Sequence, residues 1–225
     1  GSRRQSARAG SPCPAAWHHG ARPQKLHRPK QVALHGFMYS PRIELALTTV
    51  LEAHRLNRRK AGRGFEATHV LAVGLITRDF GFGEDAVVAG LLHDTLEDTS
   101  LEPDVIADRF GDHVLAVVRD VTELPKTHPW RARKEAYIDR LRQSPHDDAR
   151  AVATADKIHN LSSMTNGLER QGPAFVDAFT AGLDDMAWYQ RAVYTMLATD
   201  WTHAILDEHA RQLDRFLTVA ALTTP

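Results

Sequence analysis

Two polar residues, His93 and Asp94, stand directly after an apolar run at residues 86–92. A helix buries such a run, so the imidazole and the carboxylate at its end point into the domain, where unpaired charge is costly. Glu97 and Asp98 follow a few positions later and add two more carboxylates. A divalent metal ion is the usual partner that makes such a cluster stable. The spacing therefore predicts a metal site at the end of this helix.

Two further residues could complete the coordination from other helices. His69 lies near the start of one apolar helical stretch, and Asp156 lies amid the apolar residues of 151–161. With His93 and Asp94 they form a mixed nitrogen and oxygen set, which suits Mn²⁺, Fe²⁺, Co²⁺, Ni²⁺ or Zn²⁺ better than Ca²⁺. Four protein ligands on an octahedral ion leave positions for a phosphate oxygen and for a water that becomes a usable nucleophile near neutral pH.

Other polar residues near these ligands could act on a substrate. Glu97 lies four positions after His93, so both share one face if the helical turn continues. With Asp98 it can serve as a general base or orient the attacking water. Asn160 lies four positions after Asp156, and its amide can bind a ribose hydroxyl or a phosphate.

The densest cationic patch of the chain is a loop that precedes His69. Its basic residues are Arg55, Arg58, Arg59, Lys60 and Arg63. Such a patch suits a polyanionic substrate at the metal, and an arginine face can stack on a purine. A run of this kind is more often solvated charge, so it favours phosphate binding only in combination with the metal motifs.

Each of these residues also has a structural interpretation. A lone buried histidine is more often a hydrogen-bonded core residue than a ligand. Glu97 and Asp98 could be surface acids at a helix end, and Asp156 could cap a helix or pair with Lys157 or Arg59. A metal site explains all of these residues together, which favours it over a set of separate structural roles.

The residue pattern from Ser40 onward predicts an all-α domain, a bundle of roughly eight to ten helices. Ser40 and Pro41 are typical of an N-cap and a first helical position. Helices are predicted at 41–54, 68–80, 84–95, 102–110, 112–122, 130–143, 147–162, 174–196 and 202–220. Gly182 can break the helix at 174–196. The C-terminal helices are expected to complete the core or an oligomer surface.

The whole-chain composition is that of a globular protein without a strong overall charge. The 225 residues include 28 Lys+Arg and 28 Asp+Glu, so no global field favours nucleic acid or membrane as a partner. Cys13 is the only cysteine, which excludes a disulfide within the chain and makes a reducing cytoplasm the expected location. No apolar run approaches the roughly 20 residues of a membrane helix.

The first part of the chain differs from the rest. Residues 1–36 are rich in Arg, His, Pro and Gly with little apolar periodicity, which predicts a flexible basic tail. Gly1-Ser2 resembles an expression remnant rather than native sequence. A nucleic-acid-binding arm is the weaker alternative for the tail. Residues 37–225 predict a single domain.

The motifs around the predicted ligands resemble the HD superfamily of metal-dependent phosphohydrolases, and within it the RelA/SpoT-type (p)ppGpp hydrolases. The run His93-Asp94-Thr95-Leu96-Glu97-Asp98-Thr99 is similar to the HD-T-hydrophobic-ED-T signature of that branch. His69 precedes His93 by 24 positions, as in this branch. Further similar segments are Ala53-His54, Arg59-Lys60, Phe110-Gly111, Val121-Thr122 and Ala155-Asp156-Lys157-Ile158-His159-Asn160. The resemblance extends from about Leu45 to Met164.

The resemblance implies a role for each predicted site residue. The ligands of one metal ion, typically Mn²⁺, would be His69, His93, Asp94 and Asp156. The residues that activate or orient water would be Glu97 and Asp98. The nucleotide contacts would be Arg59, Lys60 and, on the ribose, Asn160. The reaction would remove the 3′-pyrophosphate of guanosine tetra- or pentaphosphate, giving GDP or GTP and pyrophosphate and lowering alarmone levels.

The resemblance is to a stand-alone small alarmone hydrolase, because too few residues follow 165 for a synthetase domain. Whether it is a monomer or a homo-oligomer stays open. Val70 stands where the family has proline, and 63–68 lacks its Glu-Pro-Tyr-Ile segment. These departures leave an HD phosphohydrolase of ppApp, a dinucleotide or a nucleotide phosphate as an alternative. A second alternative is a non-catalytic nucleotide-binding module, against which Glu97 and Asp98 argue.

Overall fold

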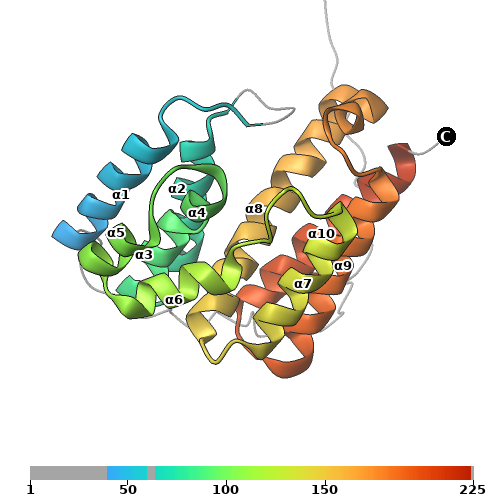
Figure 1. Cartoon of the computed structure of the whole chain (residues 1–225). Coiled ribbons are helices and arrows are strands. Elements are labelled where there is room, and N and C mark those ends of the chain that lie inside the picture. Colours follow the sequence, from blue (N-terminus) through green and yellow to red (C-terminus); the bar gives the residue numbers. More distant parts are fainter. Residues whose placement is uncertain (1–39, 60–63, 224–225) are drawn as a thin grey trace, which may run out of the picture. The chain divides into compact units, whose positions relative to one another are not determined.

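A computed structural model describes residues 40–59 and 64–223 of the chain (Figure 1). The predicted tail at 1–36 and the predicted nucleotide contact Lys60 lie outside the described residues. The extent of the domain at 37–225 stays a prediction. None of the described helices combines the length and apolar character that a membrane span requires.

The described residues form an all-α fold, as predicted. They contain no strand, only an isolated bridge between Arg58 and Phe65. The helices are α1 (Pro41–His54), α2 (Glu66–Asp79), α3 (Glu84–Leu92), α4 (Thr95–Asp98), α5 (Pro103–Phe110), α6 (Asp112–Val121), α7 (Trp130–Gln143), α8 (Asp147–Gln171), the 3₁₀ helix η1 (Gly172–Ala178), α9 (Leu183–Asp200) and α10 (Ile205–Thr223).

The predicted helix at 84–95 is wrong in its extent, because α3 ends at Leu92 and a turn separates it from α4. Two side chains bond to the end of α3. His93 Nδ1 lies 2.8 Å from the carbonyl oxygen of Gly90, and the Thr95 hydroxyl donates to that of Leu92 at 2.6 Å. Such bonds offer the backbone an alternative to a continuing helix. The turn places His93 and Asp94 between two helices instead of on one.

Two other predicted helices, at 147–162 and at 174–196, have different extents in the structure. The helix predicted at 147–162 continues to Gln171, where Gly172 has a φ of 60°, a left-handed conformation that glycine adopts without strain. The helix predicted at 174–196 is interrupted near Gly182, as its sequence allowed, and only α9 continues as an α-helix.

Helix α8 is the central element of the described fold and packs on α2 and α3 as well as on α9 and α10 (Figure 1). Its first half contributes Val152 and Ile158 to one buried apolar cluster, shared with α1, α2, α3 and α6. Its second half contributes Leu161 and Leu168 to another, shared with η1, α9 and α10. Residues around position 156 therefore lie where these two cores meet.

A glycine allows α2 and α3 to approach closely. A Cβ atom at Gly74 of α2 would lie 2.7 Å from Cδ2 of Leu91 in α3, closer than real Cβ contacts. The close approach brings together His69 of α2 and His93, which directly follows α3. The ring centroids of His69 and His93 are 5.1 Å apart.

A buried histidine in α10 makes stability depend on pH. His209 is 0% exposed, and neither ring nitrogen has a hydrogen-bond partner among the described residues. Burial, with a smaller effect of the nearby Lys157 charge, lowers the pKa of His209 to about 3. In the unfolded chain the same group takes up a proton near pH 6.5. His209 is therefore neutral in both states above about pH 6.5 and does not change the free energy of unfolding there. Below about pH 6.5 the unfolded chain binds a proton that the folded protein does not, so stability falls as the pH drops toward about 3.

We expect the free energy of unfolding to decrease by about 1 kcal/mol from this group between about pH 7 and about pH 5.5. Denaturant unfolding of the wild type and of His209→Leu at both pH values measures it. The variant should lose less stability over this interval than the wild type. An equal loss in both proteins would contradict the assignment.

Candidate active site

Three of the predicted metal ligands form a compact group in the described residues. One ligand atom from each of His69, His93 and Asp94 can be chosen so that all lie within 4.8 Å of one another. Both histidines are buried, whereas Asp94 is half-buried. Their Nε2 atoms face the carboxylate, at 3.4 Å from Asp94 Oδ2 for His69 and 3.1 Å from Oδ1 for His93. The described part of the chain thus contains a group of side chains that could hold a metal ion.

The fourth predicted ligand joins this group from α8. Asp156 Oδ1 lies 3.1 Å from His69 Nε2 and 3.8 Å from His93 Nε2. The residue is 7% exposed, so its charge lies inside the domain. Helix α2, the α3–α4 turn and α8 therefore bring together four residues that are up to 87 positions apart in sequence.

The lone pairs of this group fit a bound cation. His93 Nδ1 can only donate to the carbonyl oxygen of Gly90, so a neutral His93 presents an unprotonated Nε2 to the cluster. This buried Nε2 has no hydrogen-bond partner among the described residues, yet it lies 3.1 Å from Asp94 Oδ1. Two lone pairs at this distance repel unless a proton or a metal ion lies between them. The donor set suits a divalent transition metal.

The ionisation of the cluster follows from its charges. Burial acts to raise the pKa of Asp94, but the neighbouring His93 and His69 outweigh it and lower the pKa below its usual value. Burial acts to lower the pKa of His69, but its bonds with Asp156 and Asp94 raise it. Against the effect of burial, the pKa of Asp156 is also lowered, chiefly by Lys157, so both carboxylates are ionised near neutral pH and favour a proton on His69. A divalent cation would replace that charge.

His159 is a site residue that the sequence analysis did not identify. Its Nδ1 lies 2.8 Å from Nδ1 of His69. Burial and the nearby charges of His69 and Arg59 lower the pKa of His159 to about 4, so its ring is neutral and can accept a proton from His69. Such a bond fixes the His69 tautomer that leaves Nε2 free for a metal. The available sequence signal is the spacing of three positions after Asp156, which places His159 on the same side of α8.

We expect His159→Phe to weaken metal binding by about 10-fold or more, because the His69 ring loses the acceptor that orients it. His159→Gln is the matched control, since its amide oxygen can still accept the His69 proton. Isothermal titration with Mn²⁺ measures both dissociation constants. Equal values for His159→Phe and the wild type would show that His159 does not orient His69.

The predicted acid pair lies at the edge of the cluster. The Glu97 N–H donates to the Asp94 carbonyl oxygen at 3.2 Å, which fixes Glu97 one turn after this predicted metal ligand. Burial, followed by the charges of Glu123 and Asp94, raises the pKa of Glu97 to about 7. A carboxyl group with such a pKa can exchange a proton near neutral pH.

Lys126 is a second residue that the sequence analysis missed. Its ammonium lies 2.5 Å from Asp98 Oδ1 and 4.0 Å from Glu97 Oε1. It comes from the loop between α6 and α7, and its side chain is exposed. No motif distinguishes this lysine in the sequence. It adds a cation beside the two acids.

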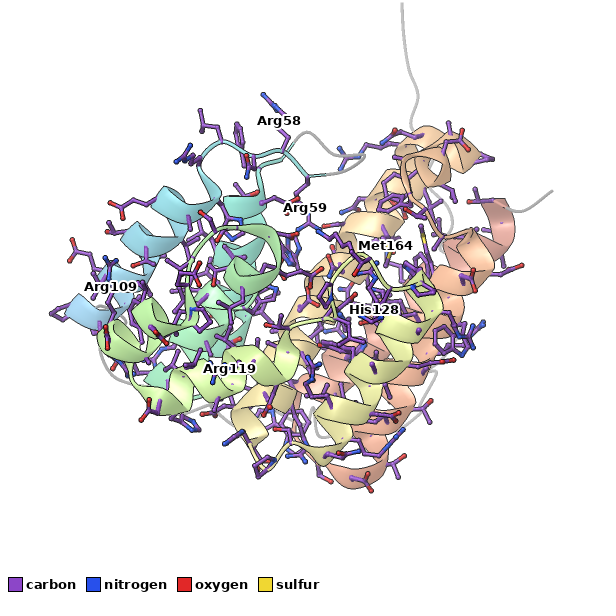
Figure 2. All side chains as sticks on the ribbon, in the orientation of Figure 1. Arg58, Arg59, Arg109, Arg119, His128 and Met164 are labelled. Carbon is purple, nitrogen blue, oxygen red and sulfur yellow. The ribbon has the colours of Figure 1, made fainter. Side chains whose placement is uncertain are left out.

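Two of the predicted nucleotide contacts meet each other beside the cluster. Arg59 Nη2 donates to Asn160 Oδ1 at 2.9 Å, and Asn160 Nδ2 donates to Asp156 Oδ1 at 2.5 Å. Figure 2 shows Arg59 directed toward α8, whereas Arg58 points outward from the loop. Glu66 Oε2 lies 3.8 Å from Arg59 Nη1. The amide side chain of Asn160 thus links the Arg59 guanidinium to Asp156, a predicted metal ligand.

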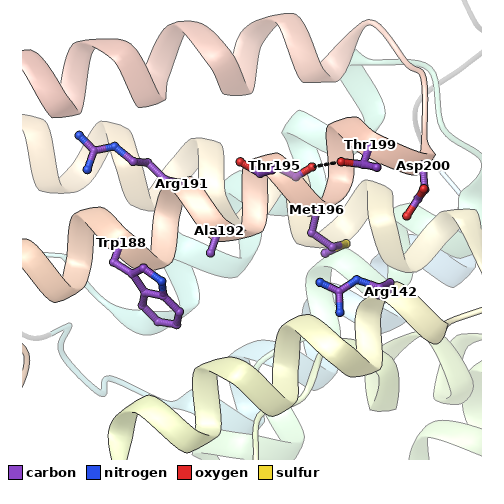
Figure 3. A pocket seen from close by; sticks show the side chains of 8 residues that line it. All are labelled: Arg142, Trp188, Arg191, Ala192, Thr195, Met196, Thr199 and Asp200. Carbon is purple, nitrogen blue, oxygen red and sulfur yellow. Dashed lines mark hydrogen bonds between the residues drawn. The ribbon is translucent and has the colours of Figure 1, made fainter.

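A separate groove of about 530 Å³ lies between α7 and α9 (Figure 3). Arg142 of α7 faces a stripe of α9 that runs from Trp188 to Asp200. None of the predicted site residues lines this groove. The chemistry expected from the sequence therefore gathers at the His/Asp cluster and not in this cavity.

Known proteins resemble the chain over the segment that carries the cluster. The HD domain family matches residues 46–179, which include all the predicted site residues. A GTP pyrophosphokinase of Streptomyces coelicolor is 34% identical over 124 residues, 54% of this chain and 14% of that protein. A guanosine-3′,5′-bis(diphosphate) 3′-pyrophosphohydrolase of Borreliella burgdorferi is 32% identical over 124 residues, 53% of this chain and 18% of that protein. The chain thus spans less than a fifth of the length of these relatives.

Solved structures share the fold over much more of their length. The crystal structure of lmo0812 from Listeria monocytogenes EGD-e is 33% identical with a TM-score of 0.60, over 69% of this chain and 98% of that one. A metazoan ortholog of SpoT, described as hydrolysing ppGpp, has 24% identity and a TM-score of 0.66, over 81% of this chain and 97% of that one. With a family match over more than half of its residues, and motifs that resemble the RelA/SpoT-type branch, the chain belongs to the HD domain family.

Proposed function

We propose that the chain is a metal-dependent phosphohydrolase that removes the 3′-pyrophosphate from guanosine tetra- or pentaphosphate. The observation that carries this proposal is the approach of His69, His93 and Asp156 to one another, with Asp94 between the histidines and Glu97 one turn further on. Mn²⁺ is the proposed metal. The proposed products are GDP or GTP and pyrophosphate.

The names of the relatives support hydrolysis of this class of nucleotide. The Borreliella burgdorferi relative is named for 3′-pyrophosphate removal, whereas the Streptomyces coelicolor relative is named for GTP pyrophosphokinase activity. The chemistry of the cluster favours hydrolysis over pyrophosphate transfer. A buried His/Asp set beside a carboxyl group of raised pKa suits attack by water, so hydrolysis is the proposed reaction.

The proposed mechanism assigns a task to each group. When bound, a divalent ion supplies Lewis acidity to a phosphoryl oxygen and makes water a better nucleophile near neutral pH. Glu97 accepts the proton of the attacking water, and Asp98 orients that water. The water oxygen bonds to the phosphorus next to the ribose 3′-oxygen, that P–O bond breaks, and the 3′-oxygen takes up a proton. Arg59, Lys60 and Asn160 bind the nucleotide.

Incubation of the purified protein with Mn²⁺ and ppGpp tests the proposal. Release of pyrophosphate and GDP in a 1:1 ratio is the expected result. No release by the wild type, with Mn²⁺ bound, would exclude this activity and leave a phosphohydrolase of another nucleotide or the nucleotide-binding module.

An HD phosphohydrolase with another nucleotide substrate is the second candidate. The observation that favours it is the altered segment before His69, in which the Arg58 guanidinium lies 4.8 Å from the centroid of the Phe65 ring. A panel of ppGpp, pppGpp, ppApp, dinucleotides and nucleoside triphosphates separates the candidates. Higher kcat/KM on a substrate other than (p)ppGpp would favour the second. A cytoplasmic location and a guanosine nucleotide as the substrate complete the proposal.

A further inference from the structure

A buried lysine adjoins the proposed metal cluster. Lys157 is 5% exposed, and its Nζ lies 2.6 Å from Oδ2 of Asp156. Lysine is almost never fully buried unless it is paired. An ammonium at this depth costs several kcal/mol of desolvation, so its retention needs strong compensation. The carboxylate supplies part of that compensation.

Two aromatic rings supply the rest. The Lys157 ammonium lies 4.9 Å from the ring centroid of Tyr137 in α7 and 5.0 Å from that of Tyr189 in α9. Both tyrosines are buried, at 3% and 4% exposure. Cation–π contacts strengthen when the cation is removed from water, as it is here. Lys157 is thus fixed from three sides by groups on three helices, and it cannot turn away from Asp156.

The two oxygens of Asp156 have different surroundings. Oδ1 faces His69 and His93 and accepts from Asn160, whereas Oδ2 accepts from Lys157. A carboxylate held through one oxygen by a fixed cation presents the other oxygen in one direction. A metal ligand needs this kind of orientation by its neighbours.

We propose that Lys157, enclosed by Tyr137 and Tyr189, is a positioning residue that turns Oδ1 of Asp156 toward the metal. The inference rests on the metal site of the proposed function. It gives α7 and α9, which contribute none of the predicted ligands, a part in metal binding.

The chain offers a matched control for the charge. Lys134 also places a half-buried ammonium against Tyr189, at 4.6 Å from the ring centroid, but it pairs with Glu123 and not with a predicted ligand. Arg133 also bonds to Glu123, at 2.9 Å, so removal of Lys134 leaves that carboxylate paired. Lys134→Met therefore removes an equal charge and an equal ring contact while it leaves Asp156 untouched.

Mn²⁺ titration by calorimetry and by electron paramagnetic resonance of the full chain tests the proposal, with circular dichroism as the folding control. Lys157→Met should raise the Mn²⁺ dissociation constant by about 10-fold or more and change the spectrum of the bound ion. Lys157→Arg keeps the charge and should stay within about threefold of the wild type. Lys134→Met should bind Mn²⁺ as the wild type does.

Tyrosine variants keep the test decisive if Lys157→Met does not fold. The Tyr189 hydroxyl has no hydrogen-bond partner among the described residues, so Tyr189→Phe removes no bond and should bind Mn²⁺ normally. Tyr189→Leu removes the ring and should weaken binding. Wild-type affinity in a folded Lys157→Met or Tyr189→Leu protein would overturn the inference. Failure of the wild type to bind Mn²⁺ would instead overturn the metal site and, with it, the proposed function.

Discussion

Replacement of His93 by alanine is expected to remove the metal ion and the turnover together. The Nε2 atom of His93 is buried, has no hydrogen-bond partner among the described residues, and lies 3.1 Å from Asp94 and 3.8 Å from Asp156. Without the His93 imidazole, the carboxylates of Asp94 and Asp156 lose one of the two histidine rings that lie against both of them. Loss of an outer neighbour of a ligand already costs about 10–100-fold in affinity, so loss of the ligand itself should cost about 100-fold or more.

Metal analysis of the purified protein and pyrophosphate release from ppGpp measure the two effects. His113→Ala is the control, because His113 is an exposed histidine that pairs with Asp148 away from the cluster. Chelation of the wild type should reproduce the loss of activity, and Mn²⁺ should restore it in the wild type but not in His93→Ala. A variant that retains one equivalent of metal would remove His93 from the ligand set.

The sequence alone predicted those parts of the site that are local in the chain. His93, Asp94, Glu97 and Asp98 lie within six positions, so one turn and one short helix place them together. The all-α fold was also predicted, because amphipathic periodicity is read within one helix. The roles of these residues, inferred from their types and spacing and from the resemblance to a family, stay predictions.

Side-chain contacts between different helices could not be predicted from residue spacing within one helix. Lys157 was considered only as a partner that could make Asp156 structural, and the predicted helix that contains Tyr189 only as part of the core or of an oligomer surface. Their contact depends on how α7, α8 and α9 pack, which no spacing within one helix expresses. Lys126 lies in a loop and has no periodicity to distinguish it. The break after Leu92 was missed because the side chain of Thr95, and not an apolar pattern, bonds to the end of α3.

Replacement of Glu97 by glutamine should abolish turnover and leave the metal in place. Glu97 is not one of the four predicted ligands, which are His69, His93, Asp94 and Asp156, so we expect the metal to bind without the Glu97 carboxylate. Its backbone N–H bonds to the Asp94 carbonyl oxygen in the wild type and would do so in the variant. Glutamine has the same shape but cannot accept a proton. Removal of a general base lowers kcat by about 10²–10⁴-fold.

The comparison of kcat with metal content separates this role from a structural one. Glu102→Gln makes the same chemical change at an exposed position, the N-cap of α5, and should leave kcat and metal content unchanged. The proposed nucleotide contacts Arg59, Lys60 and Asn160 remain in the Glu97→Gln protein, so the substrate should still bind with a similar KM. Turnover of Glu97→Gln close to that of the wild type would transfer the role of base to another group. A fall in kcat together with loss of the metal would mean that Glu97 supports the metal site instead, because a base acts on the water and not on the ligands.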